Sequence, residues 1–215
     1  MERPNRFIAY VDIDGHIETV HVKNTGRCRE LLQKGVTVYL EKSDNPLRKT
    51  LYDLVAVKKG DRLINMDSQA PNKAVGEWLL QKNLFTDLKY VKPECKYKNS
   101  RFDFYVECES KKAFVEVKGV TLETDGIVSF PDAPSERAVK HVQELIEAGR
   151  DGYETYVIFV VQMKGVKYFI PNETTHPEFA RILRMAAKEG VRVMAYDCSV
   201  TEDEMVINTP ISVKL

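Results

Sequence analysis

The segment 156–161 constrains the fold most, because it is an unbroken run of apolar residues. A strand that is apolar on both faces must be covered on both faces, as at the centre of a sheet flanked by helices. Helical spacing predicts a helix over 136–148, which follows a Pro-Ser pair, and another over 177–189. With a further strand over 191–196, this order predicts an α/β (α+β) domain with a mixed sheet.

A polar, proline-containing stretch over 67–72 marks the predicted start of that domain. Asn72 is the expected N-cap of a helix, whose apolar positions recur at helical spacing: Ala74, Val75, Trp78 and Leu79. Two strand-like runs, over 101–107 and 113–118, follow as a hairpin. We therefore expect one domain over 1–67 and a second over 68–215.

The first domain is predicted to consist of short strands separated by turns. The strands are expected over 6–11, 17–22, 36–40, 51–57 and 62–65. Asp14-Gly15 is a hairpin turn signal, and a short helix over 27–33 is expected to end at Gly35. Five short strands predict a small closed β-barrel, because closure removes exposed edges. An oligonucleotide-binding (OB-like) barrel is one candidate among such barrels.

The composition is that of an ordinary globular protein, with 43% hydrophobic and 30% charged residues and a net charge of zero. Nucleic-acid binding would therefore depend on local placement of charge. No apolar run approaches the roughly 20 residues of a membrane span, and the N-terminus lacks an apolar signal core. We expect a cytoplasmic protein without a membrane partner. The four scattered cysteines predict reduced thiols and no zinc site.

Asp103, Glu116 and Lys118 are the candidate catalytic residues, because side chains alternate along strands and the pattern puts all three on one face. With a two-residue turn at Ser110-Lys111, Asp103 would face Lys118 and lie diagonal to Glu116. Such neighbours lie about 5–8 Å apart, close enough for two carboxylates to share a cation. The alternative is a surface hairpin with one Glu–Lys pair, which would contribute little.

Two carboxylates at this spacing suit Mg²⁺ (or Mn²⁺), which takes oxygen ligands and keeps several waters. Asp103 and Glu116 are the expected metal ligands, and Glu77 on the first helix is either a third ligand or a surface carboxylate. A bound metal can deliver a nucleophile at neutral pH, and Lys118 is placed to position water or neutralise phosphate charge.

The helix over 136–148 carries a basic face. Arg137, Lys140 and His141 lie at spacings of three and four, so they share one side of the helix. That side is either a phosphate-binding surface or an ordinary solvated face.

A second basic segment lies in the first domain. Asn24 or Thr25 is expected to cap the short helix, with Arg27 and Arg29 in its first turn. Basic residues oppose the dipole at a helix N-terminus unless an anion lies there. This segment is therefore either a phosphate contact or a salt-bridged turn.

Four groups of residues, taken together, resemble a known family. They are Val22-Lys-Asn-Thr-Gly-Arg27 with Leu31-Leu32, Ser100-Arg-Phe-Asp-Phe104, Val115-Glu-Val-Lys-Gly-Val-Thr-Leu122, and Phe130-Pro-Asp-Ala133 with Arg137 and Lys140-His141. In order and spacing the whole chain is similar to the sugar fermentation stimulation protein (SfsA) family. The resemblance implies an OB-like barrel followed by a restriction-endonuclease-like domain, in a DNA-binding protein linked to expression of sugar-utilisation genes.

By position, the resemblance places Asp103, Glu116 and Lys118 in the nuclease motif and Glu77 at the helix carboxylate of that superfamily. Arg101, beside the first of these, joins the expected nucleic-acid contacts. A fold does not establish an activity, so turnover is a separate question from the scaffold.

Three functions remain as alternatives. The first is a Mg²⁺-dependent DNase, and the second is a non-catalytic DNA-binding transcriptional regulator on a nuclease scaffold. The third is a protein-interaction module that uses the acidic C-terminal half. DNA, single- or double-stranded, is the expected partner, and a homodimer is an open possibility.

Overall fold

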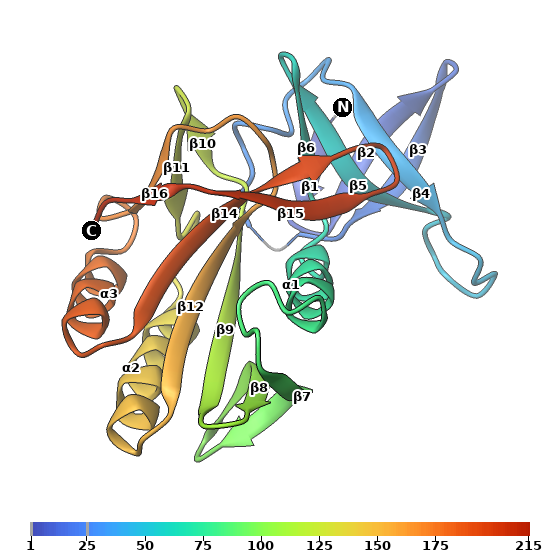
Figure 1. The fold of residues 1–215 in the computed structure, drawn as a ribbon. Coiled ribbons are helices and arrows are strands. Elements are labelled where there is room, and N and C mark those ends of the chain that lie inside the picture. The colour runs from blue at the N-terminus through green and yellow to red at the C-terminus, as the bar shows by residue number, and fades with distance from the viewer. Residues whose placement is uncertain (1, 25) are drawn as a thin grey trace.

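The computed structural model describes residues 2–24 and 26–215, which form two sheet-containing regions (Figure 1). The N-terminal region is all β, and the C-terminal region combines a mixed sheet with helices on both of its faces. This arrangement confirms the predicted fold class. The predicted boundary at 67/68 falls between the last strand of the first region and the first helix of the second.

The N-terminal sheet contains all five expected strands and one more at its start. The strands are β1 Glu2–Asn5, β2 Ile8–Ile13, β3 His16–Val22, β4 Val38–Lys42, β5 Tyr52–Lys59 and β6 Arg62–Asn65. Their order is β1-β2-β3-β5-β4, with β6 also paired to β5. Within residues 2–24 and 26–215 no ladder joins β1 to β4, so the predicted closure is absent and the barrel is open there. OB folds are partly open barrels of this kind.

The predicted helix over 27–33 is wrong, because this segment forms turns instead. The N–H groups of Leu31 and Leu32 both donate to the carbonyl of Cys28, at 3.3 and 3.0 Å. Cys28 itself has a φ of +44°, in the left-handed region, which a right-handed helix does not admit. Gly35, with a φ of +87°, ends the segment as expected.

The central sheet of the C-terminal region has the order β15-β14-β12-β9-β8-β7. Its strands are β7 Leu88–Tyr97, β8 Ser100–Cys108, β9 Lys112–Val120, β12 Glu154–Val161, β14 Arg192–Val200 and β15 Met205–Pro210. The apolar strand β12 lies between β9 and β14 and is parallel to both. Tyr156–Val161 are at most 1% exposed, which confirms the predicted central strand.

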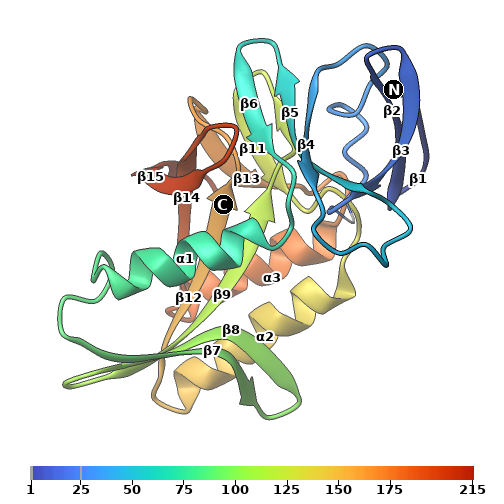
Figure 2. The ribbon, with the colours of Figure 1, turned by 90° about the vertical axis from the view of Figure 1, so that its right-hand side faces the viewer.

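Three helices are described, and they divide between the two faces of this sheet (Figure 2). They are α1 Ala70–Leu80, α2 Glu136–Arg150 and α3 Pro177–Lys188. Alternation of side chains along β12 explains this arrangement. Tyr156 and Ile158 pack on one face, in the hydrophobic core that includes α1, whereas Val157 and Phe159 pack on the other face, in the core that includes α2 and α3. Ser135 caps α2, since its Oγ accepts the N–H of Ala138 at 3.2 Å.

Strand β7 was missed by sequence reasoning. None of its residues is buried, and it contains a proline, Pro93. Both properties are typical of an edge strand, where an N–H can be lost and charged side chains reach water. The hydrophobic pattern that identifies buried strands is therefore absent here.

A small second sheet was also unexpected, and it joins the two regions. It contains β10 Glu123–Thr124, β11 Ile127–Phe130, β13 Tyr168–Pro171 and β16 Ser212–Val213. Glu123 is 3% exposed, and its carboxylate accepts from Lys59 and Arg62 of the N-terminal sheet at 2.6 and 2.8 Å. No helix in residues 2–24 and 26–215 is both long and apolar enough to cross a membrane.

Candidate metal and nucleic-acid site

The hairpin of β8 and β9 carries the three candidate catalytic residues, but its register differs from the predicted one. The pairs run from Glu107↔Lys112 to Phe104↔Val115, which puts Asp103 at the level of Glu116 and not of Lys118. The turn is Glu109-Ser110 and not the expected Ser110-Lys111, since Cys108 N–H donates to Lys111 O across it at 2.9 Å. Within these pairs the error amounts to two residues, and a shift by two leaves each paired side chain on its own face.

Glu116 lies at the centre of the site and is 2% exposed. Its Oε1 accepts from Lys118 Nζ and contacts His141 Nδ1, each at 2.5 Å. Glu116 and Lys118 belong to β9 and His141 belongs to α2, and Figure 2 shows both elements. An ionised carboxylate can only accept, so Nδ1 of His141 carries the hydrogen. The other oxygen, Oε2, is buried and has no hydrogen-bond partner in the described part of the chain.

Asp103 is held from the opposite side by α1. Its Oδ1 accepts from Asn72 Nδ2 at 2.8 Å, and its Oδ2 accepts the backbone N–H of Val117 at 2.7 Å. Asn72 is therefore a partner of the candidate catalytic aspartate, and its predicted role as N-cap is wrong. The N-cap is Gln69, since α1 begins two residues before Asn72.

The two carboxylates have pKa shifts of opposite sign. Burial, and next the charge of Glu116, raise the pKa of Asp103. Burial also works against ionisation of Glu116, but Lys118 and His141 outweigh it and lower the pKa of Glu116. A pair of carboxyl groups with separated pKa values is typical of sites where one of them is ionised and the other is poised to change.

These residues fit a divalent cation bound by two carboxylates. The bare Oε2 of Glu116 is a free acceptor, and a cation nearby would offset the repulsion between Glu116 and Asp103. Glu77 is exposed on α1, and no contact joins it to the cluster in the described residues. In those residues no three His, Cys, Asp or Glu side chains gather as a metal-ligand group. The water-rich coordination of Mg²⁺ requires only one or two protein carboxylates.

The basic face of α2 borders a groove of about 730 Å³ beside this cluster. Arg101, Arg137 and Lys140 line it and are exposed, as a phosphate-binding surface requires. His141 also reaches the groove but is 5% exposed, so it is not part of a solvated helix face. Its Nε2 accepts from Arg137 Nε at 3.4 Å, which joins the groove to Glu116 through one imidazole.

The basic segment of the N-terminal region is a loop rather than a helix. Asn24 Oδ1 accepts the N–H of Gly26 at 2.8 Å, and Arg3 donates to the carbonyl oxygens of Arg27, Gly26 and Asn24. Thr25, the alternative cap, lies outside the described residues. With no helix there is no helix dipole, so the predicted mismatch that pointed to phosphate is removed. Arg27 and Arg29 are nevertheless exposed.

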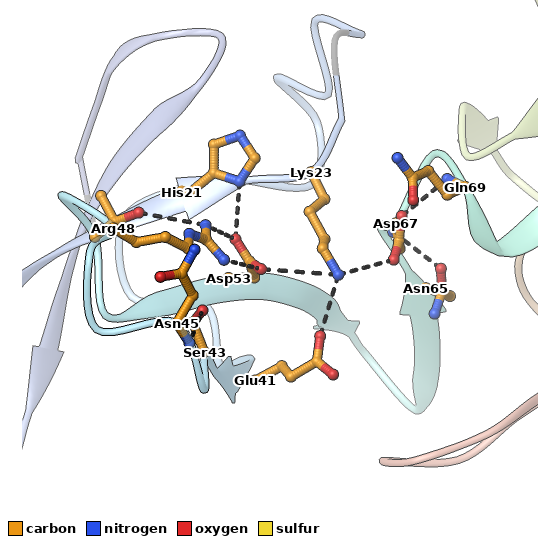
Figure 3. Close-up of polar contacts among 11 residues, drawn as sticks. His21, Lys23, Glu41, Ser43, Asn45, Arg48, Asp53, Asn65, Asp67 and Gln69 are labelled. Atoms are coloured by element: carbon orange, nitrogen blue, oxygen red, sulfur yellow. Dashed lines mark hydrogen bonds and ion pairs between the residues drawn. The ribbon is translucent and has the colours of Figure 1, made fainter.

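An ionic network next to this loop was not expected from the sequence (Figure 3). Lys23 lies between Glu41, Asp67 and Asp53, at 3.1, 3.2 and 3.7 Å, so its charge is already balanced. The Asp53 carboxylate also accepts from Arg48 and contacts His21 at 2.8 Å. Sequence patterns carry no signal for such pairs, because their members come from different strands and a loop.

Comparison with known proteins covers nearly the whole chain. The family model described as SfsA N-terminal OB domain matches residues 1–66, and that described as Sugar fermentation stimulation protein RE domain matches residues 69–204. A sugar fermentation stimulation protein homolog of Clostridium beijerinckii is 60% identical over 99% of this chain and 94% of its own length. One from Ruminiclostridium cellulolyticum is 59% identical over 100% and 95%. The solved structure of Pyrococcus furiosus SfsA in complex with Ca²⁺ has a TM-score of 0.91 and 28% identity, covering 100% of this chain and 94% of that one.

Proposed function

The chain belongs to the sugar fermentation stimulation protein family, and on that premise we propose that Asp103, Glu116 and Lys118 form a divalent-cation site that hydrolyses DNA phosphodiester bonds. The observation that carries the proposal is the buried Glu116 carboxylate, held at Oε1 and bare at Oε2. A buried acceptor without a partner costs free energy, which a cation would offset. The relative solved in complex with Ca²⁺ supports a preference for hard divalent cations.

Each side chain of the cluster has a distinct role in this proposal. Glu116 and Asp103 would hold the cation, which when bound polarises a phosphorus–oxygen bond and acidifies a water. Lys118 is close enough to Glu116 to share its charge and, from there, to neutralise charge that develops on phosphate oxygens. His141 and Asn72 orient the two carboxylates by hydrogen bonds, as the partners of metal ligands commonly do.

The groove along α2 would bind the DNA backbone. Arg101, Arg137 and Lys140 place three cations beside the cluster in a chain with zero net charge. Phosphate contacts of this type fix the position of a strand without reading its bases. Contacts along this groove are therefore expected to add affinity without sequence preference.

Cleavage of end-labelled linear and single-stranded DNA tests the proposal. We expect products with Mg²⁺ or Mn²⁺ and none with EDTA, and a rate lower by about 100-fold in Lys118→Met. Asp103→Asn should abolish cleavage while keeping the acceptor for Val117 N–H. It should also remove the rise in Tm that Mn²⁺ causes in the unaltered protein.

The matched control is Asp203→Asn, because Asp203 is an exposed aspartate in the turn before β15. It should cleave like the unaltered protein. Equal cleavage by Asp103→Asn and the unaltered protein would remove the cluster from the reaction.

A second function, DNA binding without turnover, is favoured by one observation. Both oxygens of Asp103 already accept hydrogen bonds, and no third carboxylate joins the cluster in the described residues. A site that has lost catalysis would show the same two features, an aspartate with both oxygens already bonded and too few carboxylates. In that case the protein would regulate gene expression by binding DNA.

Salt dependence of binding separates the two functions. Without turnover, the logarithm of the DNA affinity should still fall linearly with the logarithm of salt concentration. Replacing Arg137 by Gln should reduce that slope by about one. Salt-dependent binding with no cleavage under any divalent cation would favour the regulator.

A further inference from the structure

A second cavity, of about 330 Å³, lies where the two regions of the chain meet. Its walls come from the loop that follows β3, from the end of β9, and from the segment that follows β11. Gly119 lines it and directly follows Lys118 on β9. Gly119 and Lys118 are neighbours in the chain, but successive side chains of a strand point to opposite faces, so the cavity is distinct from the groove along α2. We call it the junction cavity.

Two glycines of the junction cavity leave no room for side chains. A Cβ at Gly119 would lie 2.6 Å from Gln162 Oε1, and a Cβ at Gly26 would lie 3.0 Å from Asp132 Oδ2. Neither glycine has a positive φ, so space and not backbone conformation explains them. The two glycines therefore let the Gln162 and Asp132 side chains pack against the backbone, and both of these side chains line the cavity.

The polar lining is mostly neutral. Among the described lining residues only Arg6 and Asp132 carry charge, and the others that can hydrogen-bond through side chains are Asn24, Ser68, Thr121, Ser129, Ser135 and Gln162. A phosphate would meet more positive charge than this. Neutral donors and acceptors instead match the edge of a nucleobase.

Phe130 adds an aromatic wall to the junction cavity. It is half-buried, and its ring is packed against Phe159 at 5.7 Å and Phe179 at 5.1 Å between centroids. These contacts hold the ring in place before any ligand arrives. Stacking on a fixed aromatic ring is a general way to bind an unpaired base.

From these features we propose that the junction cavity takes one unpaired base of a DNA strand and prefers a base with an exocyclic amino group. This rests on the proposed action on DNA. The volume is at the small end of ligand sites, about 300–1,000 Å³, which suits one nucleotide and excludes a duplex.

Asp132 determines the preference. Its Oδ2 accepts the N–H of Cys28 at 2.9 Å, and an ionised carboxylate has acceptor capacity for further donors. The amino group of cytosine can donate to it, whereas the carbonyl at the same position of uracil is repelled. Cytosine and uracil have nearly the same shape, so charge and hydrogen bonding alone separate them.

The test is binding of fluorescein-labelled single-stranded oligonucleotides of deoxycytidine, deoxyuridine or abasic units to the full chain in EDTA, followed by fluorescence anisotropy. We expect deoxycytidine to bind about tenfold more tightly than deoxyuridine. Asp132→Asn should reduce that ratio to about one, because an amide can donate to the uracil carbonyl. The matched change Asp203→Asn should leave the ratio unchanged.

Thermal melts would reveal whether Asp132→Asn folds. If it does not, a second variant still tests the proposal. Phe130→Leu should weaken binding of both pyrimidine oligonucleotides by about tenfold and leave the abasic one unaffected. Equal affinity for all three oligonucleotides, or a ratio that Asp132→Asn does not change, would overturn the proposal. Base preference without cleavage would refute only the nuclease function, and cleavage without base preference would refute only the junction cavity's role.

Discussion

Replacement of Asp53 by Asn tests whether the buried ionic network stabilises the N-terminal region (Figure 3). The Asp53 side chain is 6% exposed, and both of its oxygens accept from the guanidinium of Arg48. The loop between β4 and β5 is attached to the sheet at this point. Asn keeps the size of the side chain but removes the charge.

The magnitude follows from the pKa of Asp53. The Arg48 guanidinium, opposed by burial and assisted by His21, lowers that pKa from 3.8 to about 2. The difference corresponds to about 2.4 kcal/mol. Solvent screening around the partly exposed Arg48 and His21 reduces it to about 1–2 kcal/mol. We expect Asp53→Asn to lower the free energy of unfolding by that amount at pH 7.

The pH dependence has a definite sign. Because the pKa is lower in the folded state, the stabilisation is complete above the unfolded value of 3.8 and is lost as pH falls toward 2. About half should remain at pH 3. The difference between the unaltered protein and Asp53→Asn should therefore shrink by about half between pH 7 and pH 3.

Urea unfolding followed by far-UV circular dichroism at both pH values provides the measurement. The matched control is Asp44→Asn, an exposed aspartate in the same loop, with an expected change below about 0.5 kcal/mol. Two results would refute the reasoning: stability of Asp53→Asn equal to that of the control at pH 7, or a difference that is the same at pH 3.

Three further changes test the site and the core. Lys118→Met leaves the buried Glu116 without its cation and should cost about 3–5 kcal/mol in urea titrations, most of which Glu116→Gln should restore in the double variant. Glu123→Gln weakens charged hydrogen bonds between the two regions and should cost about 1.5–3 kcal/mol; an unchanged urea midpoint would contradict this. Phe159→Ala should cost about 3–5 kcal/mol, whereas Leu80→Ala, at a side chain 66% exposed, should cost under about 0.5 kcal/mol in thermal unfolding. Equal losses for these last two would contradict the burial argument.

The elements that sequence reasoning predicted correctly are those whose signal is local. The strand β12 is apolar on every residue from Tyr156, and the structure covers both of its faces. Ser135 and Gly190 bound helices through hydrogen bonds and a positive φ that involve only near neighbours. The failures, over 27–33 and at β7, are a polar loop and an exposed edge strand, neither of which has a hydrophobic period.

The candidate site shows the same division at the level of single residues. The sequence placed Asp103, Glu116 and Lys118 on one hairpin, although with the wrong register. Residue alternation has a period of two, so a two-residue slip changes the partners of the paired residues without moving their side chains to the other face. Asp103 lies just beyond these pairs, where it bonds to Asn72 of α1 and to Val117. The structure adds Asn72 and His141 as partners of the two carboxylates.

By itself, then, the sequence determined which segments are strands and helices and which three side chains can share a face. Only the tertiary structure decided what lies opposite them. Helical periodicity shows that Arg137, Lys140 and His141 lie on one side of α2, but the way α2 packs over β9 buries His141 against Glu116 and leaves the other two in the groove. The physical reason is that periodicity describes each element relative to its own axis. Burial, charge pairing and pKa depend on distances between elements remote in the chain.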